Sequence, residues 1–441
     1  MNLKIPNHKT GKIICIFIIL LFGVLLINKT LTMDSKIRDY NDIQSVIHGD
    51  PAGYYVYLPA LFIYNFDADN FPDSIEKFCG YGFELTNGKV ISKYPFGVAI
   101  AYSPFFLSAH LIAKDKNGFS RDYHRAVRIA AVFYCIFGLL FSFLFFSRYV
   151  NQIIALTSLI PLFFGTNLIY YTLKMPGYSH TISFCLIACF LYCITVCKRN
   201  PAHWCRWLLP ILFGFIISVR MLNGIVIFLI PLWDFKNFRD SISFTKKFIK
   251  DYKLMLLFIL SIVVFMSPQF LYNQYLSGSL LKEMYPGEHF TNLSHPKILL
   301  VLFGASNGLY IYTPVFILFT FCNFIGLQEK FKNGYLVLSY FIVITFIYAS
   351  WSSPSLGCAF GHRGMLDFVT LFIFPFVLTL DYLINKRKWI ILLLLAIVIY
   401  ACCYITLGIY EMWWYCFYGK GDYDYFRLIE DYFNFYHLKM P

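Results

Sequence analysis

Long apolar runs separated by short polar segments dominate the hydrophobic pattern of this chain. A run that crosses a bilayer as a helix needs about 20 mainly apolar residues. Such runs occur at about 13–31, 127–147, 152–172, 178–197, 207–233, 254–272, 309–325, 336–350, 368–383 and 389–410. With segment 96–113, or with 207–233 divided into two short helices, the total is about eleven crossings. The pattern predicts an all-α polytopic membrane protein.

The most polar stretch follows the first apolar run. The polarity of residues 33–95 predicts a long loop. A loop of this length is usually functional or disordered. Its amphipathic part, 54–66, is rich in aromatic residues, which predicts short helices lying along the membrane surface. The loop also contains nine acidic residues: Asp34, Asp39, Asp42, Asp50, Asp67, Asp69, Asp73, Glu76 and Glu84.

Composition narrows the class of protein further. Hydrophobic residues make up 59% of the 441 positions and charged residues only 14%, which is too few to cover a water-facing surface. This excludes an independent soluble enzyme domain, a nucleic-acid-binding module and a secreted scaffold. Basic residues outnumber acidic ones by 37 to 24, and in membrane proteins such an excess gathers in cytoplasmic loops.

The distribution of basic residues predicts the orientation of the chain. The lysines before residue 13 place the N-terminus in the cytoplasm, and the basic segments 235–253, 328–332 and 386–388 are expected there too. Segments 33–95, 273–297, 351–367 and the tail after 411 are then extracytoplasmic. Two arrangements remain open. Either 96–113 crosses and Arg220 lies deep in hydrocarbon, or 96–113 is interfacial and 207–233 is two short helices meeting near Arg220.

One acidic motif stands out in the long loop. Asp50 and Pro51 precede a tyrosine-rich amphipathic run that starts with Tyr54 and Tyr55. In one interpretation Asp50 only caps a helix that begins near Ala52, with Pro51 at its first position. In the other its carboxylate is catalytic. A cap does not exclude catalysis, because the same carboxylate can be held rigid by backbone contacts.

The order of several motifs resembles the GT-C superfamily of integral-membrane glycosyltransferases, in particular bacterial members related to polyprenol- and dolichol-phosphate-sugar mannosyltransferases. In that family an acidic residue follows the first helix, and Asp50 is the matching position. The further matches are Lys93-Tyr94-Pro95-Phe96-Gly97, Ser218-Val219-Arg220-Met221-Leu222-Asn223, Gly304 to Pro314, and Gly361-His362-Arg363.

The resemblance implies a domain organisation and a location. A catalytic transmembrane module would cover 1–297, with its first outer loop at 33–95 and a later outer loop at 273–297. Further helices would cover 298–410, and an aromatic extracytoplasmic tail would cover 411–441. The family favours the interfacial alternative for 96–113. It implies a bacterial inner membrane protein with its active site on the periplasmic, extracytoplasmic side.

The resemblance also implies roles for individual residues. Asp50 would be the general base that takes the proton of an acceptor hydroxyl. Arg220, then Arg363 and then Lys93 would bind the donor phosphate, for which the rigid fork of arginine donors is well suited. In the structural interpretation, Arg220 instead reaches a lipid headgroup and Arg363 pairs with Asp367. Further candidates for substrate binding are Asp42, Tyr54, Tyr55, Tyr94, His180, Asn223, Tyr285 and His362.

Whether a divalent metal takes part is left open by the sequence. Some relatives carry a further acidic residue in the second outer loop that helps to bind Mg or Mn, whereas this chain has His180 there. The expected function is transfer of one sugar from a polyprenyl-phosphate donor to a lipid-linked or surface glycan. The alternative is a transporter or lipid flippase for an anionic glycolipid, since an intramembrane arginine serves either purpose. Membrane lipids are expected partners and nucleic acid is not.

Overall fold

The computed structural model describes residues 8–35, 46–235, 238–283, 285, 287–329, 333–357, 359–412 and 425–437. These residues are mainly helical, with one two-stranded antiparallel hairpin. They form two compact units that interleave along the sequence. We call Ile16–Phe141 with Tyr171–Pro286 the loop unit, and Met1–Cys15, Ser142–Tyr170 and Gly287–Pro441 the C-terminal unit.

Six helices of the described residues are long and apolar enough to cross a bilayer, as expected for a polytopic membrane protein. These spans are Thr10–Ser35, Arg121–Phe146, His180–Arg199, Tyr252–Ser277, Arg363–Asn385 and Trp389–Met412. Several shorter apolar helices accompany them, including Cys205–Val219 and Gly334–Ser350. The total of about eleven crossings stays a prediction.

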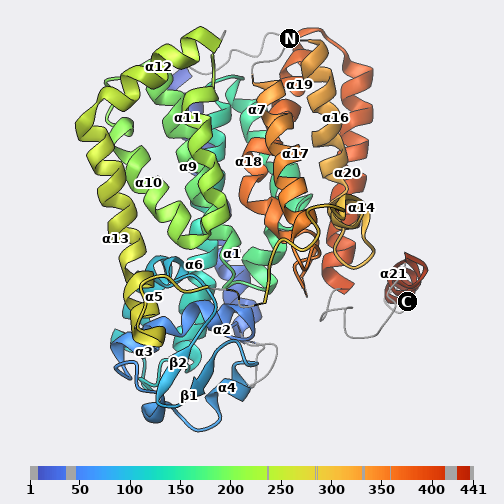
Figure 1. Ribbon diagram of the computed structural model, residues 1–441. Helices are drawn as coiled ribbons and strands as arrows, with labels where there is room; N and C mark the ends of the chain where they lie inside the picture. The colour runs from blue at the N-terminus through green and yellow to red at the C-terminus, as the bar shows by residue number, and fades with distance from the viewer. Residues whose placement is uncertain are drawn as a thin grey trace. The chain divides into compact units, whose positions relative to one another are not determined.

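The loop unit contains the long acidic loop and most of the helices around it. Its elements are α1 (His8–Ser35), α2 (Asp50–Tyr55), α3 (Tyr57–Phe62), η1 (Ala68–Asn70), α4 (Ile75–Phe78), β1 (Glu84–Thr86), β2 (Lys89–Ile91), α5 (Gly97–Ile112), α6 (Arg121–Phe146), η2 (Tyr170–Lys174), α9 (His180–Arg199), α10 (Cys205–Val219), η3 (Met221–Phe228), α11 (Leu229–Leu232), α12 (Phe238–Lys250) and α13 (Tyr252–Ser277). Within this unit, α2 to α4 and the hairpin gather at one end, and α12 lies at the other (Figure 1).

The C-terminal unit consists of shorter helices and two long ones. Its elements are α7 (Gln152–Thr157), α8 (Leu159–Phe164), α14 (Ile298–Phe303), α15 (Leu309–Tyr312), α16 (Val315–Gln328), α17 (Gly334–Ser350), η4 (Arg363–Phe368), α18 (Val369–Phe372), α19 (Phe374–Asn385), α20 (Trp389–Met412) and α21 (Tyr425–His437). The family resemblance implied a catalytic module at 1–297 and further helices at 298–410. That division by catalytic role stays a prediction.

A buried carboxylate joins the end of α1 to the start of α6. Asp34 is fully buried, and its Oδ2 accepts hydrogen bonds from Nε of Arg125 at 2.7 Å and Nε of Arg121 at 3.3 Å. Nε of Arg128 lies 3.7 Å from Oδ1. The chain therefore leaves α1 and enters α6 at the same end of the loop unit. This favours the interfacial alternative for 96–113, because a single crossing by α5 would separate these two ends.

The long apolar run at 207–233 is divided, as the interfacial alternative requires. Arg220 adopts an extended backbone conformation, with φ −153° and ψ 115°, between α10 and η3. Just before the run begins, the guanidinium of Arg206 pairs with Asp251 at the start of α13. Between Arg206 and Arg220, helix α10 packs on both α9 and α13.

Candidate active site

Asp50 is the first residue of α2, and Gly49 before it is the N-cap. Gly49 has φ +61°, which favours glycine. Its N–H donates to the carbonyl of Cys79 at 2.9 Å, and a Cβ on Gly82 would lie 1.9 Å from the Gly49 carbonyl oxygen. The interpretation in which Asp50 caps a helix that begins near Ala52 is therefore wrong: that helix already includes Asp50. Close backbone packing fixes the position of its carboxylate.

The half-buried Asp50 carboxylate accepts a hydrogen bond from a tyrosine of the second motif. The Tyr94 phenol donates to Oδ1 at 2.5 Å. The Tyr94 ring is 6% exposed and packs on Tyr54, with centroids 4.5 Å apart. Gly53 permits this packing, because a Cβ there would lie 2.2 Å from the Tyr94 ring. A hydrogen bond to an ionised carboxylate is among the stronger ones in proteins, so Tyr94 holds Asp50 in one orientation.

The later loop of the loop unit contributes a third tyrosine. Tyr285 meets the Tyr94 ring edge to face, with centroids 6.2 Å apart. The exposed ammonium of Lys93 lies 5.7 Å from the centroid of Tyr94 and 5.8 Å from that of Tyr285. These distances suit cation–π attraction. Five of the predicted residues thus lie together: Asp50, Tyr54, Lys93, Tyr94 and Tyr285.

Arg220 lies against a buried histidine. Its Nη1 is 3.3 Å from both ring nitrogens of His180, which is 1% exposed. The His180 ring also packs against Tyr171 and Tyr178, with centroids 5.2 and 6.1 Å away. Asn223, one turn after Arg220, is fully buried and donates to the Ser183 hydroxyl at 3.0 Å. Two predicted residues, Arg220 and His180, are therefore direct neighbours.

Two glycine contacts bring the Arg220 and Asp50 segments close together. A Cβ on Gly97 would lie 2.2 Å from the carbonyl carbon of Ser218, two residues before Arg220. A Cβ on Gly177 would lie 2.8 Å from Cβ of Pro51, the residue after Asp50. Residue 97 therefore approaches the backbone of residue 218 directly. The segment at Gly177, which leads to His180, packs on the start of α2.

Other predicted residues lie elsewhere. Tyr55 packs on Phe106 and Phe119, and its phenol donates to the Gly118 carbonyl at 2.5 Å. Burial raises the pKa of Tyr55 well above its ordinary value, which fits a structural residue and not an acid–base group. Asp42 lies outside the residues that the structure describes.

Arg363 and His362 belong to the C-terminal unit. His362 is fully buried, with Nε2 3.0 Å from the carbonyl oxygen of Pro354 and its ring 4.9 Å from that of Tyr348. Arg363 is partly exposed at the start of η4. In these contacts His362 packs in the interior of the C-terminal unit.

The donor atoms of His180 do not favour a divalent metal. Both nitrogens of His180 face the Arg220 guanidinium, which would repel a second cation. Within the described ranges of the chain, no three His, Cys, Asp or Glu side chains are placed to share a metal ion. Whether a divalent metal takes part stays open, and the residue roles considered below are those of the carboxylate and the cations.

The arginine cluster around Asp34 was missed from the sequence. Arg128 also donates to the carbonyl of Leu173 at 3.3 Å, and the Ile47 N–H donates to Nδ1 of His124 at 3.4 Å. These contacts tie α6 to the two segments that lead to Gly177 and to Asp50. The signal was present in the spacing of Arg121, Arg125 and Arg128, which places all three on one helix face.

Comparisons with known proteins add no relative. No protein-family model matches this chain, and no curated protein matches it.

Proposed function

We propose that this protein is a membrane glycosyltransferase that moves a single sugar from a polyprenyl-phosphate donor to a glycan acceptor. The observation that carries the proposal is the Asp50 carboxylate, half-buried at a helix start and oriented by the Tyr94 phenol at 2.5 Å. A carboxylate fixed in this way suits a general base. Aromatic rings beside it suit the faces of sugars, and cations nearby suit a phosphate.

The proposed reaction balances as one displacement at the anomeric carbon. Asp50 takes the proton of the acceptor hydroxyl as its oxygen attacks that carbon. The bond from the anomeric carbon to the phosphate oxygen breaks, and the electron pair leaves with the polyprenyl phosphate. A base in this position typically contributes about 10² to 10⁴ in rate. A β-linked donor would give an inverted product.

The leaving phosphate gains negative charge, which fixed cations can stabilise. Arg220 is the first proposed ligand, because its fork of donors can bind two phosphate oxygens at once. His180 holds Nη1 of that guanidinium on one side. Lys93 is a second cation of the same unit. Arg363 is also proposed for the phosphate, and its role rests on the sequence pattern.

The proposed setting is the extracytoplasmic face of a bacterial inner membrane, with a lipid-linked or surface glycan as acceptor.

The rival function is movement of an anionic glycolipid across the membrane. An experiment that separates the two compares surface glycans by mass spectrometry from cells with and without the gene. A glycan lacking one terminal sugar supports transfer. An intact intermediate that accumulates on the cytoplasmic face supports transport and contradicts the proposal.

A further inference from the structure

A pocket of about 430 Å³ lies in the loop unit at the end of its helices opposite to Asp50. It is lined by the last turn of α9, the first turns of α10 and α13, and helix α12. From His180, beside Arg220, to Lys198 in the pocket wall, α9 runs about 27 Å at 1.5 Å per residue. The pocket is thus separate from the proposed active site.

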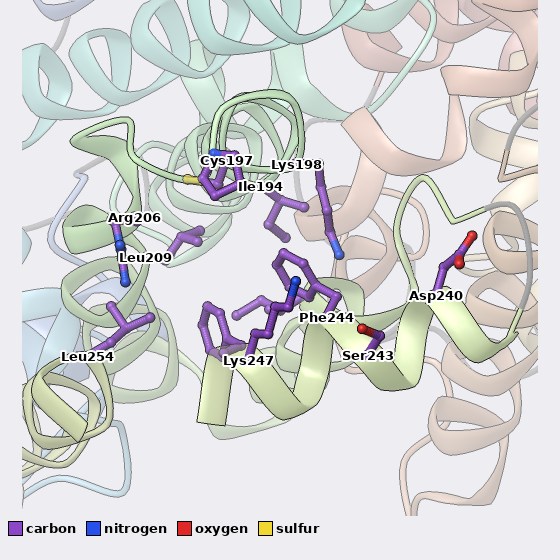
Figure 2. Close-up of a pocket in the computed structure, with 13 residues that line it drawn as sticks. Ile194, Cys197, Lys198, Arg206, Leu209, Asp240, Ser243, Phe244, Lys247 and Leu254 are labelled. Carbon is purple, nitrogen blue, oxygen red and sulfur yellow. The ribbon is translucent and has the colours of Figure 1, made fainter. Parts of the chain in front are cut away.

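The lining of this pocket combines cations with apolar side chains. Three basic residues, Lys198, Arg206 and Lys247, and one acidic residue, Asp240, line the pocket, so positive charge is in excess in its lining. The remaining wall is mainly apolar: Ile194, Leu209, Ile230, Phe244, Phe248 and Leu254. Figure 2 shows Lys198 extending from α9 toward Phe244 on α12, with Lys247 on the same helix. Such a lining matches a molecule that has an anionic group and a hydrocarbon part.

Lys198 has the most unusual environment of these cations. Its Nζ is buried and has no hydrogen-bond partner among the residues that the structure describes. The ammonium lies 3.5 Å from the ring centroid of Phe235 and 3.4 Å from that of Phe244. Two aromatic faces attract the charge but supply no hydrogen-bond acceptor atoms. A buried ammonium without hydrogen bonds is costly, and an anionic oxygen in the pocket would satisfy it.

Arg206 differs because its charge is already matched. Its guanidinium pairs with Asp251, the N-cap of α13, and stacks 5.0 Å from the Trp207 ring. This pairing holds the pocket wall in place. The Asp234 carboxylate attracts the Lys198 ammonium electrostatically but makes no hydrogen bond to its Nζ. Lys198 and the exposed Lys247 are therefore the two lining cations placed to donate hydrogen bonds to a ligand.

The surroundings favour a lipid over a soluble anion. On α12, Ile242 is 39% exposed and Ile249 is 60% exposed, beside the exposed Lys246 and Lys250. This mixture of exposed apolar and basic residues is typical of a helix that lies on a membrane with anionic lipids. Exposed aromatic residues accompany it at the same helix ends: Trp204, Trp207 and Tyr252.

We propose that this pocket binds the phosphate of an anionic membrane lipid, with Lys198 and Lys247 holding the phosphate oxygens and the apolar wall holding the start of the acyl chains. The site faces the side of the membrane opposite to Asp50, which the positive-inside pattern makes cytoplasmic. The bound lipid would also fasten α12 to the ends of α9 and α13.

The test is native mass spectrometry of the full-length protein in detergent, titrated with dioctanoyl phosphatidic acid. Dioctanoyl phosphatidylcholine and glycerol phosphate are the comparison ligands. We expect phosphatidic acid to bind best, and Lys198→Gln to weaken it about tenfold or more, as loss of a hydrogen bond to a charged group does. Lys247→Gln should weaken it by a smaller factor, and Lys246→Gln, outside the pocket, should leave it unchanged.

Three results would overturn the proposal. One is unchanged phosphatidic acid binding in both Lys198→Gln and Lys247→Gln. Phosphatidylcholine carries a phosphate whose charge its choline balances, so its equal binding would show that the net negative charge of the lipid is not recognised. Equal binding of glycerol phosphate would show a site for soluble phosphate. Lys247→Gln keeps the test decisive if Lys198→Gln does not fold, because Lys247 is exposed.

Discussion

The Tyr94 phenol donates a hydrogen bond of 2.5 Å to the Asp50 carboxylate, joining two sequence motifs 44 residues apart. Tyr94→Phe removes this hydrogen bond and keeps the ring that packs on Tyr54. If Asp50 is the base, kcat for sugar transfer should fall about tenfold, with little change in KM. Steady-state assays of the reconstituted protein measure both. Tyr55→Phe is the matched control, and an equal loss of kcat there would refute a specific role of Tyr94.

Variants of Arg220 distinguish the contribution of its charge from that of its donor geometry in phosphate binding. Arg220→Gln should raise KM for the polyprenyl-phosphate donor about tenfold to a hundredfold, because hydrogen bonds to a charged phosphate are lost. Arg220→Lys keeps the positive charge but loses the planar pair of donors, so its donor KM should lie between those of the unmodified protein and Arg220→Gln. Kinetics at varied donor concentration give the values. Arg199→Gln, at an exposed position, is the control. An unchanged donor dependence in Arg220→Gln would remove this arginine from the site.

Substitution of Asp34 should strongly lower the stability of the fold. Its buried carboxylate contacts three arginines, and Arg128 is itself only 3% exposed. Asp34→Asn removes the buried negative charge that these three cations share and should cost about 3–5 kcal/mol of stability. Arg121→Gln should cost less than about 1 kcal/mol, because the Arg121 side chain is 41% exposed. Thermal unfolding in detergent compares the variants, and equal melting temperatures would contradict the ion-pair account.

Cys79 should react only when the protein unfolds. Burial raises the pKa of its thiol from 9.0 to about 12. At pH 8 about a tenth of the thiol is thiolate in the unfolded chain, and only about 10⁻⁴ in the folded one. Because the folded pKa is the higher one, this group's contribution to stability is fully present below pH 9 and falls as the pH rises further. Maleimide labelling followed by peptide mass spectrometry measures the reaction, and rapid labelling of folded protein would contradict the prediction.

Gly97 should be sensitive to a single methyl group. In Gly97→Ala the added Cβ would lie 2.2 Å from backbone of Ser218, so α5 and α10 must separate. Because Arg220 follows Ser218 closely, both donor KM and thermal stability should worsen. Gly334→Ala is the control, since its Cβ would meet its nearest atom at 3.7 Å. A Gly97→Ala variant with normal stability and activity would show that this close approach is unimportant.

Sequence patterning predicted local features well. The break at Arg220 is one of the two arrangements that the sequence left open, and it relieves the cost of placing an arginine in the middle of an apolar run. A helix start near Asp50 follows from the proline in its first turn, although the helix begins at Asp50 and not after it. The contacts that build the site were not predictable in this way. His180 and Arg220 are 40 residues apart in the sequence, and only the packing of α9 on α10 makes them neighbours.

Long-range pairing also explains what the sequence left open. The basic residues near 121–128 fit either side of the membrane when read as loop charges. Their contacts with Asp34, 87 or more residues earlier, show that they lie at the same end as the close of α1. Lys198 likewise reads as an ordinary basic residue at a helix end. Its two aromatic neighbours come from Phe235 and from a separate helix, α12.

The central claim concerns the carboxylate of residue 50 and is tested by sugar transfer in proteoliposomes supplied with labelled polyprenyl-phosphate sugar and acceptor glycan. The account predicts that Asp50→Asn inserts and folds normally but transfers at least about a hundredfold more slowly than the unmodified protein. Asp69→Asn, at an exposed position of the same loop, should transfer normally. Full activity of a correctly folded Asp50→Asn variant would contradict the proposed mechanism.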